Sequence, residues 1–598
     1  MGYRSLKACI EDLEKHGHLI RITEEVDPNL EMAAIQLRVH DAGGPAILFE
    51  NVKGTKYRCV SNLFGTMERC RFMFRDSLET VERLIKVKTD PSLLAKNPSW
   101  IQNLIYGGYN ALPSQSKSKF EEIQISDLPL IKHWPDDGGA FITLPQVYSE
   151  DPEKKGWQGS NLGMYRIQLT GNDYKLNEEI GLHYQIHRGI GIHHTKAHQN
   201  GEPLKVAIYI GGPPSHTFSA VMPLPEGIPE VTFAGALGGR RWRYEKHDGY
   251  VISKDADFVI LGEIYPNETK PEGPFGDHLG YYSLTHDFPV MRVKKVLAKK
   301  NAIWPFTVVG RPPQEDTGFG NLIHKITGPA VPASIPGLHE VNAVDEAGVH
   351  PLLFAVGSER YTPYNKEQRP QELLTIANSI LGFGQMSLVK YLFISNKNDN
   401  PTVSVNEPKK FLTHILERVD WKRDLHFQTN TTLDTLDYSG DGLNMGSKVV
   451  IAASGEKKRE LINSLPKELN LDSAEMAMPG VISLGLDQNE TIESLSQKVE
   501  SSVSDLSGLM LMVICDDPEM VAASIRNFLW ITFTRSNPAN DIYGVGSSVR
   551  NKHWGCTGPL IIDARIKPHH APPLIPDPEV EKRVDQLSQP GASLHGLI

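Results

Sequence analysis

Two carboxylates stand five residues apart in a short stretch that is rich in glycine and proline. The stretch, Pro271-Glu272-Gly273-Pro274-Phe275-Gly276-Asp277, follows an apolar run at 258–261 and a turn at 266–269. Because proline and glycine disfavour a helix, the sequence predicts that Glu272 and Asp277 lie just beyond a strand end on a stiff loop. Such a loop suits a general acid or a ligand, although loop carboxylates are often solvated or capping groups.

Arg166 is the natural holder of a carboxylate in this sequence. It ends the motif Asn161-Leu162-Gly163-Met164-Tyr165-Arg166. Its planar guanidinium binds a carboxylate through two parallel hydrogen bonds and stays charged at every working pH. Together with Glu272 and Asp277, it would complete an arginine–acid–acid constellation.

A second group combines an amide oxygen, an imidazole and a carboxylate. Asn161, His187 and Glu230 form a mixed oxygen and nitrogen set, which suits Mn²⁺ or Mg²⁺ better than zinc. Three protein ligands leave positions for a phosphate oxygen and water. The alternative for His187 alone is a hydrogen-bonded core or surface histidine.

The ordered motifs around these residues closely resemble the UbiD family of decarboxylases, which use prenylated flavin mononucleotide (prenylated FMN). The motifs are 161–166, His187-Arg188-Gly189, Met222–Glu230 and 271–282, and the resemblance extends from about Ser5 to Lys448. It implies that Arg166, Glu272 and Asp277 are catalytic and that Asn161, His187 and Glu230 bind a metal that bridges to the flavin phosphate, with potassium nearby. The residues it assigns to cofactor binding are Asn161, Tyr165, Arg166, His187, Arg188, Met222, Pro223, Glu230 and Lys448.

The resemblance implies non-oxidative loss of CO₂ from an aromatic or conjugated acid, with the flavin taking up the charge left on the carbon. Arg166 would orient the carboxylate and the flavin, Glu272 would deliver the proton, and Asp277 would tune the pair. Phe275 and Leu279 would exclude water and keep the pKa of the acid high enough for donation.

Asp277 stands where family members that act on acrylic acids carry Glu. An Asp at this position resembles the pattern of members that act on hydroxylated aromatic acids. Quinone-precursor acids, such as a polyprenyl-hydroxybenzoate or a dihydroxynaphthoate, are the substrates that this resemblance favours. It also implies a UbiX-type flavin prenyltransferase as the cofactor supplier and a homo-oligomer, either a dimer or a hexamer.

Two further patterns imitate other cofactor sites. Five histidines crowd together, but Gly189 and Gly191 predict a break in any helical zinc motif, so four of them are interpreted as solvated or structural. The run 235–240 is a poor dinucleotide fingerprint because no acidic residue follows at the right distance. Neither pattern supports zinc or NAD. The five histidines are His183, His187, His193, His194 and His198.

Length and composition predict an ordinary globular protein of several domains. The chain has 598 residues, 40% hydrophobic and 22% charged, and its net charge of −10 argues against a nucleic-acid partner. Five scattered cysteines without CxxC spacing predict neither disulfides nor a zinc ribbon, and they fit a reducing cytosol. The N-terminus lacks a signal-peptide core and no stretch reaches the ~18 apolar residues of a membrane span. A cytoplasmic protein is expected, with peripheral membrane contact if the substrate is prenylated.

The predicted fold class is α+β with several domains. Residues 1–125 form a small α/β domain, in which Leu6, Ile10 and Leu13 share one helical face and Met32, Ile35 and Val39 share another. Residues 126–330 carry short β-branched runs between Gly/Pro turns, which indicates a β-rich domain; by resemblance it is a flavin-reductase-like split barrel. Residues 331–455 form a third, α/β domain, and 456–598 a second α/β repeat with a proline-rich tail.

The repeat is visible when residues 411–425 are set against 528–542. Phe, Leu, Arg and Asp recur in step, with an apolar strand before and after each copy, so two units at about 331–455 and 479–570 are predicted. Convergent α/β patterning is the alternative. Shorter family members carry one such unit, so the extra copy is assigned to packing or to association between protomers. The tail from Lys567 onward is expected to be extended and to drape over a neighbouring protomer.

A phosphate site needs a cation and backbone amides, which Gly446-Ser447-Lys448 offers in the first copy alone. A surface lysine after a turn is the alternative. For the whole protein, the rival to a decarboxylase is a non-catalytic flavin-binding or assembly module. A flavin carrier, however, has no need of Arg166, Glu272 and Asp277 together.

Overall fold

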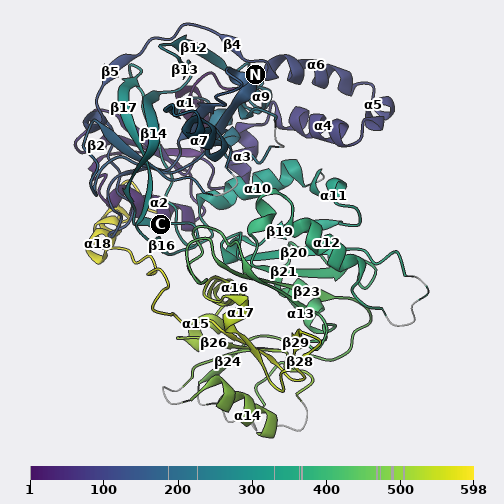
Figure 1. The fold of residues 1–598 in the computed structure, drawn as a ribbon. Helices are drawn as coiled ribbons and strands as arrows, with labels where there is room; N and C mark the ends of the chain where they lie inside the picture. The colour runs from purple at the N-terminus through teal and green to yellow at the C-terminus, as the bar shows by residue number, and fades with distance from the viewer. Residues whose placement is uncertain are drawn as a thin grey trace. The chain divides into compact units, whose positions relative to one another are not determined.

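The computed structural model describes residues 2–598 except 186–187, 225–226, 329, 363, 365–367, 467–468, 470, 472, 487–489 and 503–505. The described chain divides into two compact units. One unit comprises Met1–Thr327 together with Pro572–Ile598, and the other comprises Gly328–Ala571. The tail therefore returns to the N-terminal unit of its own chain. Figure 1 shows the elements in chain order.

A small α/β layer begins the first unit. Leu6, Ile10 and Leu13 are buried on α1, which begins after Ser5, whose hydroxyl accepts a hydrogen bond from the Ala8 N–H at 3.2 Å. Both helical faces predicted for this region are confirmed. The four-stranded sheet has the order β1-β2-β3-β18. The elements are α1 (Leu6–Lys15), β1 (Leu19–Val26), α2 (Glu31–Asp41), β2 (Ala46–Val52), β3 (Arg58–Ser61), α3 (Met67–Met73), α4 (Leu78–Thr89), α5 (Ser92–Lys96), α6 (Trp100–Ala111) and β18 (Ile303–Pro305).

A nine-stranded antiparallel sheet forms the centre of the first unit. Its path is β6-β9-β10-β17-β14-β11-β7-β8, with β5 paired to β17. The path does not close on itself, so the sheet is an open, curled half-barrel. The strands are β5 (Glu121–Ile123), β6 (Phe141–Ile142), β7 (Gln146–Glu150), β8 (Ser160–Gly163), β9 (Ile167–Gln168), β10 (Glu179–Leu182), β11 (Leu204–Ile210), β14 (Phe258–Glu272) and β17 (His286–Ala298).

Strand β14 differs from the sequence-based expectation. The turn at 266–269 does not end the strand, because the pairing with β17 shifts register between Ile264 and Thr269 and then resumes. Glu272 is thus the last residue of β14, opposite His286. It lies in the sheet, whereas the sequence predicted a loop position.

Short elements complete the first unit. The β15–β16 hairpin follows β14 directly and carries Asp277 in its turn. The remaining elements are β4 (Ser114–Gln115), α7 (Gly189–Gln199), α8 (Pro214–Ser219), α9 (Glu230–Leu237), β12 (Arg243–His247), β13 (Tyr250–Ser253), β15 (Phe275–Gly276), β16 (Tyr282–Ser283), α10 (Glu315–Thr327), α18 (Pro578–Leu587) and the 3₁₀ turns η1 (Ile125–Asp127) and η2 (Trp157–Gly159).

The second unit contains two five-stranded sheets with the same topology. The orders are β19-β20-β21-β23-β22 and β24-β25-β26-β30-β27, and in both the two central pairings are parallel and the two outer ones antiparallel. The elements of the first copy are α11 (Ala330–Ser334), β19 (Glu340–Ala343), η3 (Asp345–Ala347), β20 (Leu352–Gly357), α12 (Glu372–Leu381), η4 (Gly384–Leu388), β21 (Tyr391–Asn396), α13 (Pro408–Leu416), β22 (Leu425–Thr431) and β23 (Gly446–Ala453).

The second copy repeats the strand order of the sheet and adds short helices and a two-stranded hairpin. The stretches aligned by sequence correspond in structure, since Phe411 on α13 and Phe528 on α16 are both fully buried and each helix leads to an antiparallel edge strand. This correspondence supports a duplication. The elements are β24 (Ala474–Met478), β25 (Val481–Leu484), α14 (Ile492–Ser502), β26 (Leu511–Ile514), α15 (Pro518–Ala522), α16 (Ile525–Thr534), α17 (Pro538–Asp541), β27 (Ile542–Gly544), β28 (Ser548–Arg550), β29 (His553–Gly555) and β30 (Leu560–Asp563).

All five cysteines are free and buried, as the scattered spacing predicted. Within the described parts of the chain, every helix is too short or too polar to cross a bilayer.

Candidate active site

Four neighbouring strands and a hairpin bring the predicted trio together. Arg166 directly precedes β9, Glu272 ends β14, and Asp277 follows β15. Strand β10 pairs with β9 on one side and with β17 on the other, and β17 pairs with β14. The sheet therefore carries the arginine and the first acid, while the hairpin returns the second acid to them.

The Arg166 guanidinium is hydrogen-bonded to both acids. Its Nε donates to Glu272 Oε1 at 2.8 Å and its Nη2 to Glu272 Oε2 at 2.7 Å, which is the two-point geometry expected of this pair. Its Nη1 donates to Asp277 Oδ2, and Nη2 also donates to Ser283 Oγ at 2.8 Å. The ring of Phe275 lies 4.8 Å from the guanidinium carbon. The side chains are buried, with exposed fractions of 8% for Arg166 and 0% for Glu272.

The ionisation of Glu272 is opposite to the sequence-based expectation. Burial by itself raises the pKa of Glu272, but the charge and hydrogen bonds of Arg166, with a smaller contribution from His183, outweigh burial and hold the pKa well below its usual range. Burial likewise raises the pKa of Asp277, whereas hydrogen bonding from His278 and the charge of Arg166 lower it overall. Apolar surroundings therefore do not keep either acid protonated in this state.

His183 is a site residue that the sequence analysis interpreted as solvated or structural. Its Nδ1 lies 3.2 Å from Glu272 Oε2, and its ring packs against Phe288 at 4.1 Å between centroids. Burial, and then the charge of Arg166, lower the pKa of His183, so the ring is neutral and its Nδ1–H donates to the carboxylate. The sheet places His183 beside the trio, because His183 follows β10 directly and Leu182 pairs with Ile167, the neighbour of Arg166.

Asp137 is a second residue that sequence reasoning missed. Its Oδ1 accepts the Gly276 N–H at 2.8 Å, and its Oδ2 accepts the N–H groups of His133 and Trp134 at 3.1 and 3.0 Å. Burial raises the pKa of Asp137 to about 7 despite these three donors. Asp137 thus ties the hairpin before Asp277 to the segment 133–137. No spacing rule identifies such a contact, because it joins residues 139 positions apart.

The proposed metal group is only partly described. His187 lies outside the described residues. The Asn161 amide donates to Tyr165 Oη at 3.1 Å, and the Leu162 N–H donates to Glu230 Oε2 at 2.9 Å, so strand β8 brings Asn161 next to the first residue of α9. A Cβ at Gly189 would lie 2.2 Å from Asn161 Oδ1, which explains a glycine there.

The other predicted cofactor residues differ in burial and in their contacts. Burial raises the pKa of Tyr165 to about 12, and the charges of Arg188 and Glu230 also act on its hydroxyl. Arg188 caps α7 and donates to Gln185 at 3.2 Å. Met222 is buried and Pro223 is exposed.

Lys448 lies in the second unit, on β23. It is 4% exposed, and its Nζ donates to the Ser387 carbonyl. Burial lowers the pKa of Lys448 to about 8. The backbone amide of Ser447 donates to Asn537 Oδ1 at 2.9 Å, so it does not contribute to the phosphate cradle expected from Gly446-Ser447-Lys448. The alternative, a surface lysine after a turn, is wrong, because these residues are the start of a buried strand.

The structure corrects the reason that the sequence analysis gave for setting the histidine group aside. Gly189 and Gly191 do not break a helix, since α7 begins at Gly189 and carries His193, His194 and His198. His193 instead pairs with Ser149 Oγ at 2.9 Å, and His194 pairs with Tyr184. The glycines at 235–239 end α9 instead of opening a helix, as a dinucleotide loop would require.

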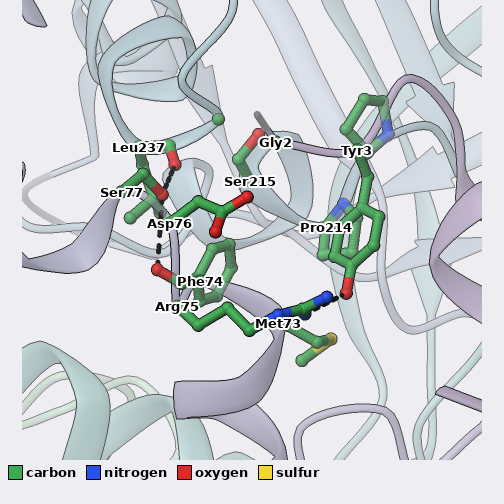
Figure 2. Close-up of a pocket in the computed structure, with 12 residues that line it drawn as sticks. Gly2, Tyr3, Met73, Phe74, Arg75, Asp76, Ser77, Pro214, Ser215 and Leu237 are labelled. Atoms are coloured by element: carbon green, nitrogen blue, oxygen red, sulfur yellow. Dashed lines mark hydrogen bonds between the residues drawn. The ribbon is translucent and has the colours of Figure 1, made fainter. Parts of the chain in front are cut away.

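A separate cavity lies near the N-terminus, lined by Tyr3, Arg75, Ser77, Ser215 and Gly238 among others (Figure 2). Its volume of about 30 Å³ holds about two water molecules. The Ser77 hydroxyl donates across it to the Leu237 carbonyl at 2.5 Å. It shares no residue with the Arg166 group and is too small for an aromatic acid.

Comparison with known proteins agrees with this geometry. Three family models match the chain: the 3-octaprenyl-4-hydroxybenzoate carboxy-lyase N-terminal domain at residues 10–88, the Rift-related domain at 110–312 and the C-terminal domain at 317–453. Together they cover more than half of the chain, which therefore belongs to the UbiD family. The protein is a carboxy-lyase, and the resemblance drawn from its motifs is confirmed.

The chain is similar to named relatives over most of its length. It is 36% identical to a Chlamydia pneumoniae protein named as one component of a 4-hydroxybenzoate decarboxylase, over 97% of each chain. It shares the fold of Sedimentibacter hydroxybenzoicus vanillic acid decarboxylase, with a TM-score of 0.64 at 23% identity over 84% of this chain and 100% of that one. It also shares the fold of HmfF from Pelotomaculum thermopropionicum, solved with FMN, with a TM-score of 0.58 at 21% identity over 77% and 97%. An evolved dimeric form of HmfF was solved with prFMN.

Proposed function

We propose that this protein removes CO₂ reversibly from a hydroxylated aromatic acid, with prenylated FMN and a divalent metal ion, Mn²⁺ or Mg²⁺, as cofactors and K⁺ nearby. The observation that carries the proposal is the Arg166 fork held between two buried acids. When bound, the modified flavin supplies an acceptor for the charge that departing CO₂ leaves behind. Relatives named for 4-hydroxybenzoate and vanillic acid support the aromatic class of substrate.

The residues of this chain would hold the carboxylate and move one proton. A substrate carboxylate that takes part of the Arg166 fork leaves Glu272 with less counter-charge, so the pKa of Glu272 rises and it can hold a proton at neutral pH. Glu272 then delivers that proton to the carbon that loses CO₂. Asp277 keeps the remaining guanidinium N–H groups in place.

Glu230 and Asn161 fit a hard cation. Glu230 is partly buried, and burial raises the pKa of its carboxyl group to about 7. Among the described residues, only hydrogen bonds from the Leu162 N–H and from its own backbone N–H act to lower this pKa. A carboxylate short of positive charge beside an amide oxygen is the ligand chemistry of Mn²⁺ or Mg²⁺. We assign His187 as the third ligand by its motif.

The direct test is co-expression with a UbiX-type flavin prenyltransferase, followed by an absorbance spectrum and a screen of aromatic acids. The screen measures CO₂ release and deuterium exchange at the ring. We expect exchange with phenolic acids, including quinone precursors, and none with protein lacking the flavin. A protein that binds flavin yet exchanges no acid would favour the flavin-carrier alternative.

Metal and flavin should be lost together. We expect that His187→Ala and Glu230→Gln each lower metal and flavin content in parallel, because the phosphate loses its bridging counter-charge. Elemental analysis and flavin absorbance on the same sample measure both. The exposed Glu202→Gln variant is the control. Full flavin content in metal-free His187→Ala protein would remove the bridging role.

Lys448 allows a comparison between the two copies. Strand register places Pro559 at the position equivalent to Lys448, since Val449 and Leu560 follow them at matching points of the two sheets. We expect Lys448→Ala to weaken flavin binding, and Pro559→Ala to leave it unchanged, with the same elution volume for both on size exclusion. If Lys448→Ala left flavin binding unchanged, another cation would have to make the phosphate contact.

A further inference from the structure

The turn of the catalytic hairpin is contacted by the C-terminal tail. Asp277 lies in the turn between β15 and β16, and each of these strands has only two residues. The turn is closed by two short hydrogen bonds, from the Gly280 N–H to the Asp277 carbonyl and from the Asp277 N–H to the Tyr281 carbonyl, at 2.9 and 3.0 Å. A hairpin of this size is marginal without further support.

The tail pairs with the turn of this hairpin through an isolated antiparallel β-bridge. The Tyr282 N–H donates to the Pro572 carbonyl at 2.9 Å, the Leu574 N–H donates to the Gly280 carbonyl at 3.3 Å, and Tyr281 faces Pro573 in an antiparallel bridge. These bonds belong to one compact unit, which contains both the hairpin and Pro572–Ile598. The contact lies three to five residues beyond Asp277.

The proline pair suits an edge position. Pro572 and Pro573 have no N–H group to donate, so the tail offers the hairpin one carbonyl and one N–H and leaves a blunt outer edge. Leu574 packs against the main core of the unit and lies 3.5 Å from where a Cβ at Gly310 would be. The strand is therefore held by packing as well as by its two hydrogen bonds.

Helix α18 anchors this strand from its C-terminal side. Asp577 caps the helix by accepting the N–H groups of Glu579 and Val580 at 2.8 and 3.2 Å, with Pro578 in the first turn. Arg583 donates to Glu31 at 2.9 Å on α2, and α18 lies beside α2 in Figure 1. Val584 is fully buried in the same core.

We propose that Pro572–Leu574, anchored by α18, is a positioning strand that orders the hairpin bearing Asp277. The three family models end at residue 453, so this strand is supplied by a part of the chain outside them. The segment Pro572–Leu574 follows the second α/β copy directly in the chain. The C-terminal extension beyond residue 453 would therefore contribute to the active site as well as to packing. The catalytic part of the inference rests on the proposed function, whereas the ordering of the hairpin does not.

Hydrogen exchange on the full-length protein tests the ordering. Leu574→Pro removes the N–H that bonds to Gly280, and we expect it to speed amide exchange across residues 276–283 by roughly 2- to 10-fold, the range that corresponds to loss of one hydrogen bond. Ile575→Pro is the matched control, because Ile575 is 66% exposed and follows directly. Leu574→Ala keeps the N–H and separates the hydrogen bond from side-chain packing. Unchanged exchange in Leu574→Pro would overturn the proposal.

The wild-type protein provides a test that needs no variant. The amides of Tyr282 and Leu574 should exchange slowly in residue-resolved measurements, and free exchange of both would overturn the proposal even if Leu574→Pro failed to fold.

Kinetics test the positioning role. In Leu574→Pro we expect kcat to fall several-fold, with KM and flavin content unchanged, because the strand orders a group that acts in the transition state. Faster exchange with an unchanged kcat would refute positioning. If the wild-type protein decarboxylates no acid, the proposed function fails. The amide exchange rates of Leu574→Pro and its controls would still show whether Pro572–Leu574 orders the hairpin.

Discussion

Glu272→Gln should lower decarboxylation and substrate proton exchange by ~10²–10⁴-fold, because the variant loses the proton donor and keeps nearly the same shape. The amide oxygen can still accept one hydrogen bond from Arg166. Flavin content should therefore stay at the wild-type level. Single-turnover CO₂ release and deuterium incorporation into the product measure the two steps separately.

A neighbouring glutamate provides the control for this experiment. Glu268 lies on the same strand, β14, and pairs with Arg292 at the surface. Glu268→Gln should retain normal turnover. Turnover near the wild-type level in Glu272→Gln would show that another group donates the proton, and His183, the donor to the same carboxylate, would be the next residue to test.

Removing the positive charge at Arg166 should have the second large effect. Arg166→Met leaves Glu272 and Asp277 buried without the guanidinium, and loss of one partner from a buried ion pair costs about 3–5 kcal/mol. We expect the free energy of unfolding to fall by about this amount at pH 7, and decarboxylation to be lost. The ion pair between Arg292 and Glu268 is exposed and contributes little to stability. Arg292→Met should therefore change the free energy of unfolding by less than ~1 kcal/mol.

The pH dependence of this loss has a definite sign. In the wild-type protein the pKa values of Glu272 and Asp277 are lowered, so their contribution to stability is present above about pH 4 and is lost as the pH falls. In Arg166→Met the main influence that lowers the pKa of Glu272 is lost, so this pKa rises and stability is lost as the pH increases, whereas His278 still lowers the pKa of Asp277. The difference in Tm between the two proteins should shrink from pH 7 to pH 4. A constant difference would show that the acids are not coupled to Arg166.

Much of the fold could be predicted from periodicity. The faces of α1 and α2 and the β-branched runs of β11 and β17 are local patterns, and local patterns survive when burial agrees with them. The repeat between 411–425 and 528–542 was also visible, because the same helix and edge strand bury the same residues in both copies. The continuation of β14 to Glu272 was not predictable, since a register shift absorbs the turn that the sequence indicated.

The sequence by itself determined which chemical groups the site contains. The resemblance of its motifs to the UbiD family identified Arg166, Glu272 and Asp277 as a set that supplies one guanidinium and two acids. The tertiary structure decided how these groups ionise. Burial and the arginine shift the pKa of Glu272 in opposite directions, and the outcome depends on hydrogen-bond distances of 2.7 and 2.8 Å that no sequence pattern encodes. The contacts of His183, Asp137 and Leu574 with the site were likewise decided by folding, because each joins segments that are far apart in the chain.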